Sequence, residues 1–146
     1  MYDILRSSHS GLRWVALALL LAAIGNAFAK MRSNKYEKGD KMLNLFAMVL
    51  LHLQATLGIV LSFFSGKVSY AAGWMKSDLN RFFGMEHILL MLVAVILATI
   101  GRKKAESKSD IFQKHKTIAI WYIIVLILII AAIPWPFRTV LGGSWM

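Results

Sequence analysis

The sequence predicts an all-α membrane protein, a four-helix transmembrane bundle. Three observations predict it: four long apolar runs, short polar connectors between them, and basic residues concentrated in two of these connectors. Hydrophobic residues make up 58% of the chain, and the mean hydropathy is +0.62. A soluble domain of 146 residues has too small a core to enclose this many apolar side chains.

The apolar runs cover residues 14–29, 42–64, 82–100 and 118–133. A helix needs about 20 apolar residues to cross roughly 30 Å of hydrocarbon at about 1.5 Å per residue. The second and third runs meet this length. We expect Gly11, Leu12 and a snorkelling Arg13 to extend the first run, and Trp135 and Phe137 to complete the fourth.

Two short motifs lie at the ends of these runs. Residues 27–29, Ala-Phe-Ala, resemble a signal-peptide cleavage site, but we expect the first segment to be retained as a span. Pro134 and Pro136 predict the end of the last helix, because proline lacks a backbone N–H. We expect the aromatic side chains of Trp135, Phe137 and Trp145 to anchor the C-terminus at the outer headgroups.

The distribution of Lys and Arg predicts the orientation. Connectors 30–41 and 102–116 carry eleven of the seventeen basic residues, which places both connectors in the cytoplasm. The N-terminus, the loop at 65–81 and the C-terminus then lie outside, in a single up-down-up-down domain over residues 1–146. The net charge of +10 is explained by these flanking charges and their attraction to anionic lipid headgroups, and we expect no nucleic acid as a partner.

Four histidines, one for each segment, are the candidate functional residues: His9, His52, His87 and His115. Ionisable side chains at membrane depth are costly and usually mark a functional site. Counting residues along each run predicts an outer pair, His9 and His87, and an inner pair, His52 and His115, while His52 facing His87 is a second arrangement. We expect His52, near the bilayer midplane, to be the most deeply buried, and His9 and His115 to be hydrated at the boundaries.

The spread of the histidines favours one haem, or two haems stacked across the membrane, over a zinc ion, which takes three or four ligands at one depth. We expect Gly84, one turn before His87, to leave room for a macrocycle, and Arg13 to pair with a propionate. A proton relay that includes Glu86, or interhelical hydrogen bonds at each histidine, remain alternatives. Because the chain has no cysteine, disulfides, c-type haem attachment and thiolate-held clusters are excluded.

Five short stretches carry a resemblance to a known family. They are His-Ser-Gly-Leu-Arg-Trp at 9–14, His-Leu-Gln at 52–54, Glu-His at 86–87, Lys-His-Lys at 114–116, and Ile-Pro-Trp-Pro-Phe-Arg at 133–138. The chain resembles, over its whole length, small four-span bacterial inner-membrane proteins labelled cytochrome b-like. The resemblance implies b-type haem, a respiratory setting and ligand roles for all four histidines. In the familiar two-haem cytochrome b pattern a single helix supplies two histidines, whereas each segment here offers one, so the haem count stays at one or two.

Two functions of different classes follow. The first is a b-type haem protein that passes electrons from quinol or a partner complex to an acceptor. The second is a cofactor-free accessory subunit of a respiratory or other membrane complex. Candidates to line a quinone pocket are Gln54, Glu86, Arg13 and Trp14, although the last two also suit anchors at the membrane boundary. Besides the lipid bilayer, we expect a larger membrane complex or a second copy of the chain as partner.

Overall fold

The computed structural model describes residues 1–142, and within them it is helical and contains no strand. Four helical stretches are long and apolar enough to cross a membrane: α1 (Tyr2–Lys30), α2 (Lys38–Phe64), Asp78–Glu106 and α5 (Ile111–Ala132). The third stretch consists of α3 (Asp78–Arg81), the π-helical segment η2 (Phe82–Glu86) and α4 (His87–Glu106). The predicted all-helical fold with four candidate spans is confirmed. Trp145 lies outside the described residues.

The helices extend beyond the apolar runs. α1 begins at Tyr2 and includes His9, and α5 begins at Ile111 and includes His115. His9 and His115, which lie just before the first and fourth apolar runs in the sequence, are therefore inside the corresponding helices. The reason is length: a 29-residue helix is roughly 44 Å long, which matches the full bilayer with its headgroup regions and not the hydrocarbon alone.

Local signals set the helix ends. The Asp40 carboxylate accepts a hydrogen bond from the backbone N–H of Glu37 at 2.7 Å before α2, and Asp110 accepts one from the N–H of Gln113 at 3.0 Å before α5. The short 3₁₀ helices η1 (Trp74–Lys76) and η3 (Thr139–Leu141) lie in the connection before α3 and after α5, respectively. α5 ends two residues before Pro134, as the sequence predicts.

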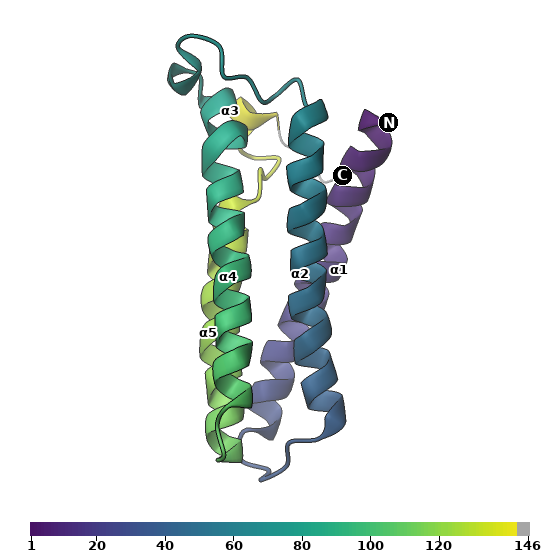
Figure 1. Ribbon diagram of the computed structural model, residues 1–146, viewed down its shortest axis with the longest axis vertical. Helices are drawn as coiled ribbons and strands as arrows, with labels where there is room; N and C mark the ends of the chain where they lie inside the picture. The colour runs from purple at the N-terminus through teal and green to yellow at the C-terminus, as the bar shows by residue number, and fades with distance from the viewer. Residues whose placement is uncertain (143–146) are drawn as a thin grey trace.

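Figure 1 shows the four long helices side by side, with the α1–α2 and α4–α5 connections at the lower end and the connection from α2 to α3 at the upper end. α1 packs on α2 and α5, and α4 packs on the same two helices. The four helices therefore form a ring in which each contacts two neighbours. α4 and α5 approach closely at Gly101, where a Cβ atom would lie 2.3 Å from Cβ of Trp121.

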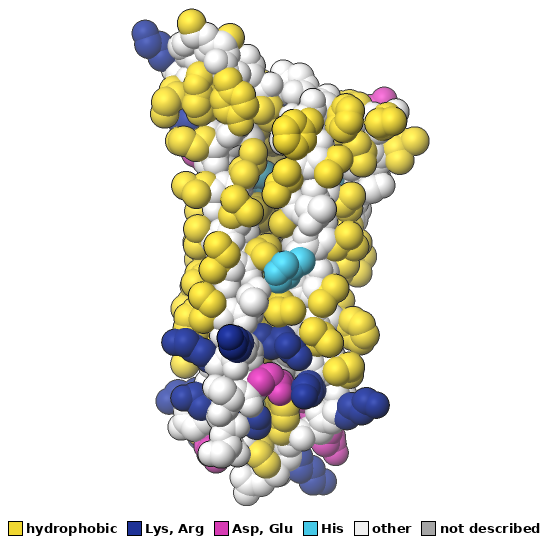
Figure 2. Space-filling model, in the orientation of Figure 1, with side chains coloured by type: hydrophobic (Ala, Val, Ile, Leu, Met, Phe, Trp, Pro, Cys, Tyr) yellow, Lys and Arg dark blue, Asp and Glu magenta, His cyan; other side chains and the backbone are white. Residues whose placement is uncertain are grey.

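Charge and apolar surface are separated along the bundle. Figure 2 shows Lys and Arg gathered at the lower end, while apolar side chains cover most of the visible face above them. The core between the helices contains many alanines, including Ala23, Ala47, Ala98 and Ala132, each 0% exposed. Small side chains at the contacts let membrane helices approach closely.

Candidate functional site

A cavity of about 460 Å³ lies between the long helices and is lined by residues of α1, α2, α4 and α5, of η2, and of the segments that follow α2 and α5. Two of the four histidines, His9 and His87, line it, together with Arg13, Gln54 and Gly58. Volumes of roughly 300–1,000 Å³ are typical of pockets for small molecules and cofactors. Among the described residues that line the cavity there is no Asp or Glu.

His9 and His87 face one another from α1 and α4. Their ring centroids are 6.3 Å apart and the ring planes meet at 77°. The structure therefore brings together the two histidines that the residue count pairs, while their position on the outer side of a membrane stays a prediction.

The orientation of His87 is fixed by the end of α5. Its Nδ1 lies 2.7 Å from the carbonyl oxygen of Ala132, and because a carbonyl only accepts, Nδ1 carries the hydrogen and donates it. This carbonyl is available because it belongs to the last turn of α5, and the residue four positions later, Pro136, has no N–H. Nε2 of the neutral ring keeps its lone pair for another partner.

The same Pro-Trp-Pro run satisfies the neighbouring carbonyls. The indole Nε1–H of Trp135 donates to the carbonyl oxygen of Ile130 at 2.9 Å, and the guanidinium of Arg138 donates to that of Ala131 at 3.3 Å. The residue four positions after Ile130 is Pro134, so this carbonyl too lacks a helical partner. Two prolines two residues apart thus release alternate carbonyls, one for Trp135 and one for His87. From the sequence the two prolines predict a helix end, and the same spacing also identifies the carbonyls of Ile130 and Ala132 as those without a helical partner.

The His9 ring is held by α2. A Cβ atom at Gly58 would lie 2.9 Å from Cε1 of His9, closer than side-chain carbons approach in proteins. Gln54, 8% exposed, donates from Nε2 to the backbone carbonyl of His9 at 2.7 Å. Nδ1 of His9 and Oε1 of Gln54 are buried and have no hydrogen-bond partner among the described residues. Buried polar atoms are normally satisfied, so two unsatisfied atoms in one cavity indicate a missing ligand or water.

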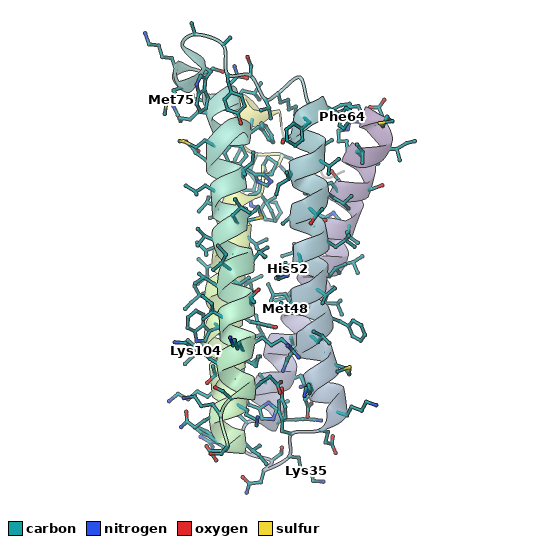
Figure 3. All side chains as sticks on the ribbon, in the orientation of Figure 1. Lys35, Met48, His52, Phe64, Met75 and Lys104 are labelled. Carbon is teal, nitrogen blue, oxygen red and sulfur yellow. The ribbon has the colours of Figure 1, made fainter. Side chains whose placement is uncertain are left out.

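His52 is exposed on the outside of the bundle, so the expectation that it is the most deeply buried histidine is wrong. Figure 3 shows it at mid-height of α2, pointing toward α4. Its Nδ1 donates to the carbonyl oxygen of Met48 at 2.9 Å, and its Nε2 lies 3.3 Å from Oγ1 of Thr99 on α4. Counting residues gives the depth of a side chain but not the face of the helix on which it lies.

His115 is 1% exposed, so the expectation that it is hydrated is also wrong. Its Nε2 donates to the carbonyl oxygen of Lys35 at 2.9 Å, and its ring lies 5.2 Å from that of Tyr36. Lys35 is at the lower end of the bundle, well below His52 (Figure 3). The structure therefore does not bring His52 and His115 together as an inner pair.

The lower end contains a buried polar network around Tyr36. Its hydroxyl donates to the carboxylate of Glu106 and accepts from Nδ2 of Asn44 at 3.3 Å. Tyr122 of α5 donates its hydroxyl to the backbone carbonyl of Asn44 at 2.6 Å. Burial first, and the hydrogen bond to Glu106 second, raise the pKa of Tyr36 above its ordinary value. This network ties the connector between α1 and α2 to α4 and α5.

The remaining predicted residues lie as follows. The open side of Gly84 is covered by Tyr70 and Trp74, whose ring carbons would lie 3.4 and 3.5 Å from a Cβ atom there, so Gly58 and not Gly84 makes room in the cavity. Glu86 forms an ion pair with Arg81 at 2.7 Å.

Arg13 lines the cavity, and its guanidinium also lies over the Trp14 ring, 5.2 Å from the centroid. Trp14 packs edge-on against Trp135 at 6.4 Å. Of the four candidates for a quinone pocket, Arg13 and Gln54 line this cavity.

Searches of protein-family models, of curated proteins and of solved structures found no match to this chain. Within residues 1–142 there is also no cluster of three or more His, Asp or Glu side chains suited to a metal ion. The site is therefore described by its own geometry: two imidazoles, an apolar cavity and a polar rim.

Proposed function

We propose that this chain is a membrane-embedded b-type haem protein that transfers electrons, with one haem held between His9 and His87. The observation that carries the proposal is the pair of imidazoles facing each other in the cavity. Their ring centroids are 6.3 Å apart, so His9 and His87 would both be within reach of one group bound in this cavity.

The residues of the cavity fit this group in three further respects. The backbone carbonyl of Ala132 orients His87, as second-shell carbonyls commonly orient metal-binding histidines. Gly58 leaves the space that the His9 ring occupies. The walls are largely apolar, with Ile88, Met91, Leu92 and Val95 of α4 among them, and the polarity of its surroundings is one of the ways a protein tunes a haem.

When bound, haem would supply one-electron redox chemistry. The chain supplies ligation through His9 and His87, orientation through Ala132 and Gln54, and a low-dielectric environment through the apolar walls. Quinol or a partner complex is the proposed electron donor, and the resemblance to the cytochrome b-like family supports the respiratory setting.

The proposed location is a bacterial inner membrane, in an up-down-up-down topology with both termini outside. The gathering of Lys and Arg at the end of the bundle that carries the α1–α2 and α4–α5 connections supports a cytoplasmic position for that end. In this topology the histidine pair lies in the outer half of the membrane.

The accessory-subunit function is the second candidate, and the position of His52 favours it. An exposed histidine at mid-height would face lipid, where an ionisable side chain is costly. Contact with a partner subunit or a second copy of the chain would remove it from lipid. Such a contact is compatible with a haem at His9 and His87, so cofactor content separates the two functions.

The test is the haem content of protein purified in mild detergent from cells supplied with haem. We expect a low-spin b-type pyridine haemochrome spectrum with one haem for each chain. His9→Ala and His87→Ala should each remove most of the haem, whereas His52→Ala, the matched control, should retain it. Absence of a Soret band from the wild-type protein would favour the accessory-subunit function, and full haem content in both His9→Ala and His87→Ala would contradict the assigned ligands.

A further inference from the structure

Two positive side chains lie at one end of the cavity. Arg6 of α1 and Lys67 of the connection after α2 both line it, while none of the lining residues that the structure describes is acidic. Neither of these two side chains takes part in the ion pairs with Asp or Glu among the described residues, which use Lys30, Lys41 and Arg81. The described lining is therefore positive near Arg6 and Lys67.

Arg6 and Lys67 make few other contacts. The guanidinium of Arg6 lies 6.0 Å from the centroid of the Tyr2 ring. The ammonium of Lys67 lies 5.0 Å from the centroid of the Phe83 ring and donates to the backbone carbonyl of Gly142 at 3.4 Å, a long hydrogen bond. Both groups keep donors available for an anion.

The two cations lie on the outer side of the histidine pair. Arg6 is three residues before His9 and so shares its face of α1, one turn closer to the N-terminus. Lys67 follows the end of α2 at Phe64. The cavity thus has imidazoles further in and two cations at its mouth, an arrangement that fits an apolar ligand with acidic groups at one edge.

We propose that Arg6 and Lys67 bind the carboxylates of the ligand held by His9 and His87 and thereby fix its orientation. The inference rests on the proposed function, because haem b carries two propionates at one edge. An arginine fork matches a carboxylate with two parallel hydrogen bonds, and a lysine offers a compact charge. Arg13, four residues after His9 on the same face, lies on the opposite side of the histidine from Arg6.

The test compares two probes that differ only in their acidic groups, haemin and haemin dimethyl ester, titrated by absorbance into protein purified from haem-depleted cells. We expect the wild-type protein to bind haemin at least about tenfold more tightly than the ester, since hydrogen bonds to charged groups have about this effect. Arg6→Gln combined with Lys67→Gln should remove that preference and leave ester binding unchanged. Arg32→Gln combined with Lys76→Gln, which removes the same charge from exposed positions outside the cavity, should preserve it.

Each other outcome contradicts a defined statement. Equal binding of haemin and the ester by the wild-type protein overturns the proposal that Arg6 and Lys67 bind carboxylates, and leaves the proposed function intact. An equal loss of binding of both probes in the Arg6 and Lys67 double variant assigns these residues to folding and also overturns that proposal. If the wild-type protein binds neither probe, the proposed function fails and the inference fails with it. If the wild-type protein binds haemin but a stoichiometric amount of oleate displaces it, Arg6 and Lys67 would be assigned to binding a lipid carboxylate instead.

Discussion

At the scale of single residues, each histidine has a different environment. His52, His87 and His115 each have a ring nitrogen within hydrogen-bond distance of another segment of the chain, so interhelical bonding accounts for part of their presence. His9 does not follow this pattern: its Nδ1 is buried and unpartnered. The His9 ring can occupy its position because residue 58 is a glycine and has no Cβ atom that would overlap the ring. The least satisfied histidine is thus the one that points to a ligand.

Gly58→Ala tests this environment. The added Cβ would lie 2.9 Å from Cε1 of His9 and would force the ring away from its position. We expect at least a severalfold loss of haem while the unloaded protein stays as stable as the wild type, because alanine favours a helix over glycine by about 1 kcal/mol. Gly25→Ala is the control, since nothing lies within 4 Å of a Cβ atom there. The measurements are the haem content of each variant and its thermal unfolding followed by circular dichroism. Full haem content in Gly58→Ala would contradict the assigned position of His9.

Residue-level prediction from sequence succeeded in pairing His9 with His87 and failed for position around the helix. Counting residues placed His9 and His87 in one outer group, and the structure brings their rings together. The same count could not show that His52 lies on an outer face, because packing against α4 decides this. It also could not distinguish Gly58 from Gly84, since the ring that needs the space comes from another helix.

At the scale of elements, the connector between α1 and α2 is fixed to the rest of the bundle by hydrogen bonds to α4 and α5. Tyr36 reaches Glu106 at the end of α4, and the carbonyl of Lys35 accepts from His115 of α5. The sequence showed this connector as basic and polar, which predicts its side of the membrane. The contacts of Tyr36 with α4 and α2 could not be predicted from the charge of the connector.

Tyr36→Phe should lower the midpoint of thermal unfolding, because Glu106 loses a hydrogen bond of about 1–3 kcal/mol. The pKa of Tyr36 is raised in the folded state, so its stabilising contribution is complete below the ordinary tyrosine pKa of about 10 and is lost as the pH rises above it. The difference between the wild type and Tyr36→Phe should therefore be constant near neutral pH and shrink above about pH 10.

Circular dichroism in detergent at several pH values measures this difference. Tyr2→Phe, in the first turn of α1, is the control for loss of a hydroxyl. A difference that grows at high pH would show that the Tyr36 hydroxyl is not held protonated by its surroundings.

At the scale of the whole molecule, the ends of the bundle differ in charge and in packing. The lower end combines the basic connectors with the Tyr36 network, and the upper half contains the cavity. The apolar runs sufficed to predict the four helices, whereas the orientation that the basic connectors predict stays a prediction. The cavity was not predictable in this way, because it depends on which side chains remain small where all four helices meet.

The orientation is testable with reporters fused to the C-terminus. Because connectors 30–41 and 102–116 carry eleven of the seventeen basic residues, we expect alkaline phosphatase fused after residue 146 to be active and a fluorescent protein that matures only in the cytoplasm to be dark. Fusions within connector 102–116 should give the opposite pattern and serve as the internal control. A bright C-terminal fusion would reverse the topology.

The two prolines that end α5 have a consequence for the order of biogenesis. The carbonyl that orients His87 belongs to Ala132, which is synthesised 45 residues after His87. His87 cannot take its final orientation until the fourth helix has been inserted beside α4. If the proposed haem binds at this pair, its loading has to follow insertion of α5, and in the proposed topology it would take place from the outer face, where Arg6 and Lys67 lie.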